Sequence, residues 1–298
     1  MKYKKKISIL FIIIATLSLS SLAIALDNKT KSDSTADKKT ARKIAAKKLR
    51  YVENEAYGFG ETLEYKVGYK FITAGTGYFK ILPEPKYVNG RPCYDIRFEV
   101  KSFKGLEFLY KVRDRYRTVI DAKGIFPYRF EQHIREGNYK RDSKATFDQI
   151  NHQAIIKKKD KRTGKTKVKK YDVPEYVHDI VSAFYYVRTL DLGSMKKGSI
   201  INVENFLKDT TYSLGVKIHG KQTIEVEAGT FKCIVIEPLV KEGGLFKNEG
   251  EILIWVTDDD RKIPVKVGTE IIIGFVGAEL TKYSGIRGPI KAKIKKKK

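Results

Sequence analysis

Strict alternation of large apolar and polar residues recurs along this chain and directs it toward a mainly β fold. The clearest stretch covers residues 62–71, where every second side chain is aromatic or aliphatic: Leu63, Tyr65, Val67, Tyr69 and Phe71. A period of two places these side chains on one face of an extended strand. Each such strand therefore has one face for a core and one for solvent. The same alternation appears at 94–101 and 128–135.

Shorter stretches of the same kind predict many further strands. They cover residues 75–82, 115–121, 142–148, 152–158, 166–172, 199–206, 210–218, 222–227, 231–237, 250–257, 263–269 and 271–282. Gly, Asn, Asp and Pro separate them, which favours hairpins and an antiparallel meander over βαβ units. Turns are expected at 88–90, 136–138, 150–151, 219–221 and 258–260. A longer hairpin is expected to turn near 163–164.

One segment has helical spacing instead. Between 176 and 190 the apolar residues are Val177, Ile180, Val181, Phe184 and Val187, after Pro174 and before Gly193. A lone amphipathic helix in a β chain commonly packs against an open sheet. The predicted fold is therefore mainly β, with a single curved antiparallel sheet, half-barrel-like, and one amphipathic helix packed against it. It forms one domain over 58–284.

The N-terminus has the pattern of a secretory signal peptide over 1–25. A basic stretch at 1–6 precedes an apolar run at 7–22, and Ala23-Ile24-Ala25 is an A-x-A site. Cleavage after Ala25 is favoured over retention as an anchor, because the apolar run is short for a membrane span. No Cys follows this run, which excludes a lipoprotein. The expected location is the periplasm.

The net charge of +25 suggests nucleic acid or anionic membrane, but most of it lies outside the predicted sheet. The signal carries four Lys, residues 27–50 nine basic and three acidic residues, and 291–298 six Lys. Residues 157–170 hold nine basic residues and one acidic residue. We expect a basic, partly helical linker at 26–57 and a basic disordered tail at 285–298. The nearly neutral remainder argues against nucleic acid as a partner.

The sequence offers little metal or nucleophile chemistry. The four His are not at metal-ligand spacing, and neither CxxC nor GxSxG occurs. No metal and no cofactor is expected. The two cysteines, Cys93 and Cys233, allow either a disulfide that closes a long loop or two buried thiols on separate strands.

Two polar groups are the remaining catalytic candidates. Asp258, Asp259 and Asp260 lie between two predicted strands, where Asp is typical of a turn, and this interpretation is favoured over a Ca²⁺ or acid–base site. His178, Asp179 and Arg188 lie on the predicted helix. Buried polar anchors that orient the helix are favoured over catalysis there.

Four motifs in order resemble a known family. They are 59–65 followed by 74–77, then 179–188, then 228–233 with 237–238, and finally 255–265 (WVTDDDRKIPV). The chain is thereby similar to exported bacterial proteins catalogued as domain of unknown function 3108, over about 58–283. The resemblance implies the compartment and a long, curved antiparallel sheet, and it implies no activity. The lysine-rich hairpin and both basic extensions depart from the family.

The leading hypothesis is a non-enzymatic exported protein of the Gram-negative envelope that binds an apolar or amphipathic ligand, or an envelope partner. Its candidate lining is aromatic: Tyr65, Tyr69, Phe71, Tyr94, Phe98, Phe184 and Trp255. One alternative is a hydrolase of envelope polymers that uses Asp258, Asp259 or His178. Another is a scaffold that docks on anionic lipid through 157–170 and the tails.

Overall fold

In a computed structural model of the chain, the described residues are 49–69, 72–108, 110–159, 166–207, 209–242, 245–246, 252–271 and 274–295. The predicted signal peptide and most of the linker lie outside them. The strands are β1 Thr62–Tyr69, β2 Ile72–Ile81, β3 Lys86–Val88, β4 Arg91–Ser102, β5 Arg113–Asp121, β6 Pro127–Glu136, β7 Tyr139–Asp148, β8 Gln153–Lys159, β9 Thr166–Asp172, β10 Ile200–Leu207, β11 Thr210–Val226, β12 Gly229–Glu242, β13 Leu245–Phe246, β14 Leu253–Thr257, β15 Pro264–Ile271, β16 Gly274–Ser284 and β17 Lys293–Ile294. The helix α3 covers Ile180–Val187, and short 3₁₀ helices cover Lys104–Leu106 and Leu192–Ser194.

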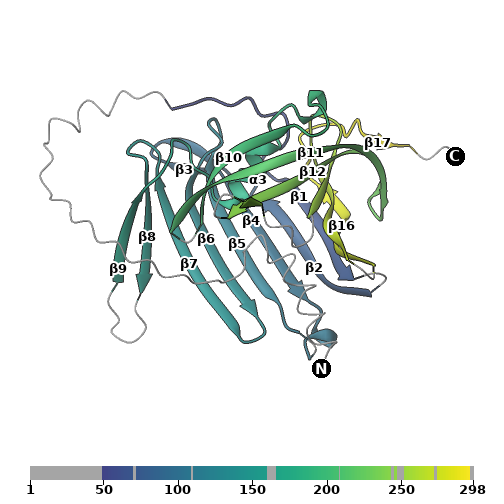
Figure 1. The fold of residues 1–298 in the computed structure, drawn as a ribbon, viewed down its shortest axis with the longest axis horizontal. Coiled ribbons are helices and arrows are strands. Elements are labelled where there is room, and N and C mark those ends of the chain that lie inside the picture. The colour runs from purple at the N-terminus through teal and green to yellow at the C-terminus, as the bar shows by residue number, and fades with distance from the viewer. Residues whose placement is uncertain are drawn as a thin grey trace, which may run out of the picture.

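All the described ladders are antiparallel and form one curved sheet (Figure 1). Its order is β9-β8-β7-β6-β5-β4-β2-β1-β16-β15-β14-β12-β11-β10, with β3 on β4 and both β13 and β17 on β12. Within the described part of the chain no ladder joins the two edge strands, β9 and β10. Instead, the Tyr171 and Phe206 rings meet across this gap at 5.5 Å between centroids. The sheet is therefore open, which confirms the predicted fold class.

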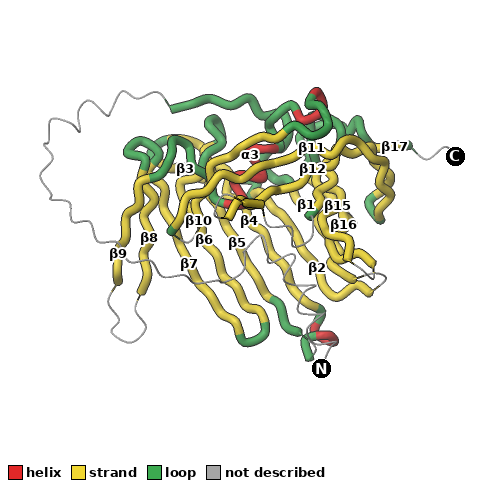
Figure 2. The backbone as a smooth tube through the Cα atoms, in the orientation of Figure 1, coloured by secondary structure: helices red, strands yellow, loops and turns green. Residues whose placement is uncertain are grey.

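The helix α3 lies against the inner face of the sheet (Figure 2). Val181 and Tyr185 pack with the inward side chains of β4, β5 and β6. Ala183 and Val187 pack with those of β10, β11, β12 and β14. Opposite sides of one short helix thus join the two arms of the curved sheet.

The helix is shorter than the predicted 176–190. Asp179 has an extended backbone and accepts hydrogen bonds from the amides of Val181 and Ser182, while the Ser182 hydroxyl accepts from the Asp179 amide. This capping box fixes the helix start at Ile180. Tyr176 has a φ of 54°, which a helix interior does not accommodate.

One predicted hairpin turn is wrong. Residues 219–221 lie inside the single long strand β11, where the pairing with β12 shifts register between Ile218 and Gly220. Gly220 has a φ of 113°, which glycine adopts without steric cost, so it forms a bulge that bends the strand. The turns at 89–90, 137–138 and 258–260 are present.

The C-terminal segment also differs from the prediction. A disordered tail is expected from 285, yet residues 285–295 lie against the sheet, and β17 pairs with β12. The Asp259 carboxylate accepts from the Ala292 amide at 2.9 Å, and Lys291 Nζ lies 3.0 Å from the Asp260 carboxylate. Local charge composition does not reveal these long-range partners.

The connections between strands fall at two ends. We call one the clasped end, because the N-terminal strap 50–61, the turn 258–263 and the C-terminal segment 285–295 meet there. The other, which we call the distal end, carries the start of β2 at Ile72, the loop 103–112 and the turn 137–138. The cavity and the exposed apolar side chains are located relative to these two ends.

Candidate functional site

An apolar cavity of about 90 Å³ lies between α3 and the inner face of the sheet. One water molecule needs only roughly 10–15 Å³ by the same measure, so the cavity has room for several. Its walls come from both arms of the sheet and from the helix: Tyr65, Val67, Gly77, Phe79, Phe98, Val100, Tyr116, Ile180, Val181, Phe184, Pro238, Ile252, Ile254, Pro264, Val267 and Ala278. Apolar cavities of this kind stay dry and accept apolar guests.

Small residues on two strands help to leave this space open. Gly77 on β2 and Ala278 on β16 face the cavity, where neighbouring inward positions carry Phe or Val. A Cβ added at Gly77 would meet the Glu99 carbonyl oxygen at 3.4 Å and the side chains of Val67 and Val100 at 3.7 Å, all ordinary contact distances. The strand geometry therefore tolerates a Cβ at this position.

The structure places three of the seven candidate lining residues at the cavity: Tyr65, Phe98 and Phe184. Tyr94 lies instead at the clasped end, where its ring packs on Tyr57 and Phe59. Trp255 does not line the cavity. It packs in a cluster with side chains of β12 and β15 that also includes Tyr65, and its indole N–H donates to Gln222 at 2.7 Å. Phe71 and the side chain of Tyr69 lie outside the described part of the structure.

Several wall residues are not among the candidates from the sequence, notably Phe79, Val100 and Val267. The alternation that predicts their strands already placed them on an inward face. Which inward residues share the cavity depends on how the strands pair, and this pairing cannot be deduced from a single sequence. Among the described candidates that carry a polar group, only Tyr65 lines the cavity. Its hydroxyl donates a hydrogen bond to the Pro264 carbonyl at 2.8 Å.

Asp179 is a fully buried helix cap. Besides the two helix amides, its carboxylate accepts a hydrogen bond from the Thr118 hydroxyl on β5 at 2.7 Å. Burial raises the pKa of Asp179 to about 6, although these hydrogen bonds oppose the shift. Its contacts tie α3 to the sheet.

His178 joins the N-terminal strap to the helix. Arg50 donates to Nε2 at 3.1 Å, so Nδ1 carries the proton and faces the Ser182 hydroxyl at 3.1 Å. The ring stacks on Tyr186. Burial, together with the Arg50 charge, lowers the pKa of His178 well below its usual value, which keeps the imidazole neutral.

Arg188, at the C-terminal end of α3, forms a buried ion pair with Glu61. Its two terminal nitrogens lie 2.7 and 2.9 Å from the two carboxylate oxygens, and both side chains are 1% exposed. It also donates to the Arg261 carbonyl at 3.1 Å, and its guanidinium lies near the rings of Tyr57 and Tyr185. Burial alone would lower the pKa of Arg188, but the charge and hydrogen bonds of Glu61, together with Tyr185 and Tyr57, outweigh burial and raise the pKa.

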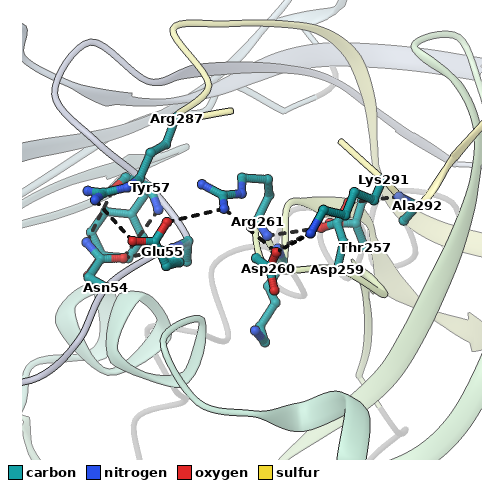
Figure 3. A network of polar contacts seen from close by, with 12 residues as sticks. Asn54, Glu55, Tyr57, Thr257, Asp259, Asp260, Arg261, Arg287, Lys291 and Ala292 are labelled. Atoms are coloured by element: carbon teal, nitrogen blue, oxygen red, sulfur yellow. Dashed lines mark hydrogen bonds and ion pairs between the residues drawn. The ribbon is translucent and has the colours of Figure 1, made fainter. Parts of the chain in front are cut away.

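The acidic segment 258–260 forms the turn between β14 and β15 (Figure 3). One Asp259 oxygen accepts from the Arg261 and Lys262 amides and the Thr257 hydroxyl, and the other accepts from the Ala292 amide. Asp258 pairs with Lys221 at 2.8 Å. These carboxylates are engaged in holding the turn and the C-terminal segment in place.

The two polar groups are held by different partners and do not share the cavity. His178, Asp179 and Arg188 are buried in the packing of α3, whereas Asp258 and Asp259 serve the turn. No group of three or more metal-ligating side chains occurs among the described residues. Cys93 on β4 and Cys233 on β12 are free, buried thiols, so the disulfide alternative is not formed in this structure.

Comparison with known proteins identifies one family and several distant folds. The family described as "Protein of unknown function (DUF3108)" matches residues 64–281. No curated protein matches the chain. No helix in the described residues is long and apolar enough to cross a membrane.

Three solved structures are similar to this chain over most of its length. A β-barrel-like protein of the DUF1849 family from Brucella abortus is 10% identical, covers 76% of this chain and 97% of its own, and has a TM-score of 0.46. A Bacteroides fragilis protein, to which export and a YmcC-like fold are ascribed, is 11% identical, with 78% and 99% coverage and a TM-score of 0.29. A hypothetical protein from Chlamydia trachomatis is 8% identical, with 80% and 93% coverage and a TM-score of 0.31.

Arg188→Met should lower the free energy of unfolding by about 3–5 kcal/mol, because it leaves the Glu61 charge buried without a partner. The double variant Glu61→Leu/Arg188→Met should recover most of this loss, since no charge then remains buried. Urea unfolding followed by circular dichroism measures both. If the double variant loses as much unfolding free energy as Arg188→Met and Glu61→Leu lose together as single variants, the pair is not coupled as described.

Asp179 should make stability depend on pH between about 4 and 6. Its folded pKa of about 6 exceeds the ordinary Asp value, so the folded state holds its proton over this range while the unfolded state releases it. Stability should therefore fall as pH rises from 4 to 6, relative to Asp179→Asn, which caps the helix without titrating. Thermal unfolding at several pH values tests this, and parallel pH profiles for the two proteins would contradict it.

Proposed function

Because the chain belongs to the DUF3108 family, which is described only as of unknown function, we propose its function from its own geometry. It is an exported, non-enzymatic protein that binds an apolar or amphipathic molecule in the cavity beneath α3. The observation that carries this proposal is the apolar cavity of about 90 Å³ between the helix and the two arms of the sheet.

Packing supports a binding role for this space. Protein interiors are normally filled to the density of organic crystals, and an unfilled apolar cavity costs stability. Here Gly77 has room for a Cβ, yet the space remains. A bound apolar molecule would restore the missing dispersion contacts with the aromatic walls.

The class of ligand follows from the wall chemistry. No charged side chain contributes to the walls, which come from aliphatic, aromatic, glycine and proline residues. A hydrocarbon chain or ring can enter without leaving a polar group unpaired. A charged or strongly polar head would have to remain outside the cavity, which describes an amphipathic molecule as well as an apolar one.

Export to the periplasm is the second part of the proposal. It rests on the basic start at 1–6, the apolar run at 7–22 and the Ala23-Ile24-Ala25 site. Intact mass measurement of protein from a periplasmic extract should give a chain that begins at Leu26. A chain that retains residues 1–25 would indicate an anchor instead.

Filling the cavity should abolish ligand binding without unfolding the protein. Ala278→Leu adds three carbons into the space, and we expect at least a tenfold weaker affinity for benzene, a single apolar ring of the size that small apolar cavities admit. The free energy of unfolding should change by no more than about 3 kcal/mol, the upper end of the usual range for overpacking. Titration calorimetry and urea unfolding measure the two quantities.

Ala228→Leu is the matched control, because it makes the same change in the turn between β11 and β12, outside the cavity walls. It should bind benzene like the wild type. Equal benzene binding by Ala278→Leu and wild type would place the ligand elsewhere, and no benzene binding by the wild type would refute the proposal.

A further inference from the structure

Three large apolar side chains are exposed together at the distal end of the sheet. Ile72 at the start of β2 is 62% exposed, and Phe103 and Phe108 in the loop between β4 and β5 are 41% and 78% exposed. Single exposed apolar residues are ordinary on protein surfaces, but a cluster on neighbouring loops marks an interaction site. We call these three residues the apolar rim.

Backbone hydrogen bonds hold the rim in a defined arrangement. The Phe103 amide donates to the Ala74 carbonyl at 2.9 Å, which ties the loop to β2 close to Ile72. On the other side, the Gly137 amide donates to the Lys111 carbonyl at 2.8 Å, which ties the same loop to the turn between β6 and β7. The loop that carries Phe103 and Phe108 is therefore held by hydrogen bonds to its neighbours on both sides.

The surface around the rim is positively charged. Residues 101–113 carry four exposed basic side chains, Lys101, Lys104, Lys111 and Arg113, against one acid, Glu107. Glu107 is itself held by Arg113 at 2.7 Å and by Lys111 at 3.9 Å. The net charge of this segment is therefore +3.

Further positive charge lies on the edge strand β9, where Lys167, Lys169 and Lys170 are exposed. Lysines on an edge strand also prevent it from pairing with another sheet, so they have a use in the isolated protein. The same strand nevertheless adds to the positive potential of the molecule, since 157–170 hold nine basic residues and one acidic residue.

This combination of apolar and basic groups identifies the partner. Lys is depleted at protein–protein interfaces, whereas aromatic residues ringed by Lys and Arg match a bilayer with anionic headgroups. The apolar rim can enter the headgroup boundary while the basic side chains reach lipid phosphates. We propose that the distal end of the sheet docks on an anionic lipid bilayer through Ile72, Phe103 and Phe108.

The position of the cavity also favours docking through the distal end, because the cavity walls extend toward that end. On β1 and β4 the cavity walls extend from Tyr65 and Phe98 to Val67 and Val100, which lie nearer the distal end of their strands. The clasped end is instead covered by the strap, the turn and the C-terminal segment. The docking surface does not depend on whether the cavity binds a ligand, so the two proposals can fail separately.

Vesicle flotation tests the proposal with protein purified from cells that express the full chain. We expect it to float with vesicles of phosphatidylcholine containing one third phosphatidylglycerol, and much less with pure phosphatidylcholine or in 0.5 M salt. Ile72→Ser/Phe108→Ser should reduce the bound fraction at least about tenfold, because burying one aromatic side chain alone is worth about that factor. Benzene binding should be unchanged.

Two control variants, Tyr87→Ser and Lys80→Glu, make the same kinds of change at the clasped end. Tyr87→Ser removes an aromatic side chain that is 66% exposed on β3, and it should leave flotation unchanged. Lys104→Glu should weaken binding severalfold, whereas Lys80→Glu, exposed near the clasped end of β2, should have little effect because it lies more than one Debye length from the rim. The proposal is overturned if Tyr87→Ser reduces flotation as much as Ile72→Ser/Phe108→Ser does, and Lys80→Glu as much as Lys104→Glu does.

A direct contact measurement separates a bilayer from a protein partner. Phe108→Trp should show a blue-shifted emission on anionic vesicles and quenching by brominated lipid, whereas Tyr87→Trp should show neither. Trp255, the only native Trp, gives the same background in both. If neither tryptophan responds, the rim does not contact lipid, and a protein partner becomes the better explanation for its exposure.

Discussion

The ion pair between Glu61 and Arg188 is the contact on which the rest of the structure depends. It joins the residue before β1 to the C-terminal end of α3, and Arg188 also reaches the Arg261 carbonyl just before β15. Two charges taken out of water cost several kcal/mol each, and the bonds between the two side chains and to the Arg261 carbonyl offset this cost. Glu61, Arg188 and Arg261 come from three distant parts of the sequence, and their contacts therefore fix the end of the helix at one position over the sheet. Asp179 and its contact with Thr118 fix the other end.

A helix held at both ends explains how the cavity persists. An α-helix resting only on apolar contacts could settle into the space left by Gly77 and Ala278 and fill it. Because polar contacts hold α3 at its start and its end, the gap between Phe184 and the strands remains open. The same arrangement divides the molecule into a clasped end, rich in ion pairs and hydrogen bonds, and a distal end with exposed apolar and basic side chains. The proposed docking surface lies on the distal end, whereas the proposed binding space lies beneath α3, away from the polar contacts of the clasped end.

Much of the fold could be predicted from the sequence, but less of the site. Alternation over 62–71 and helical spacing after Pro174 predict the sheet and its helix, because both patterns record which face is buried. They do not record which strands pair. Tyr65 and Phe98 therefore line the cavity, whereas Trp255, which the sequence groups with them, does not. The pattern around Gly220 was interpreted as a turn, since a bulge and a turn both place glycine between two alternating segments. The role of Glu61 could not be predicted, because its partner lies 127 residues away.

These features together describe a sheet that holds an apolar space under a fixed helix and presents a basic, apolar rim beyond it. Native mass spectrometry of protein purified without detergent from the cells that produce it tests most directly whether this space holds a molecule. We expect a species heavier than the polypeptide, whose added mass is released by organic solvent and is identified there as an apolar or amphipathic compound. A single species with the mass of the polypeptide alone, from extracts in which such compounds are present, would contradict this expectation.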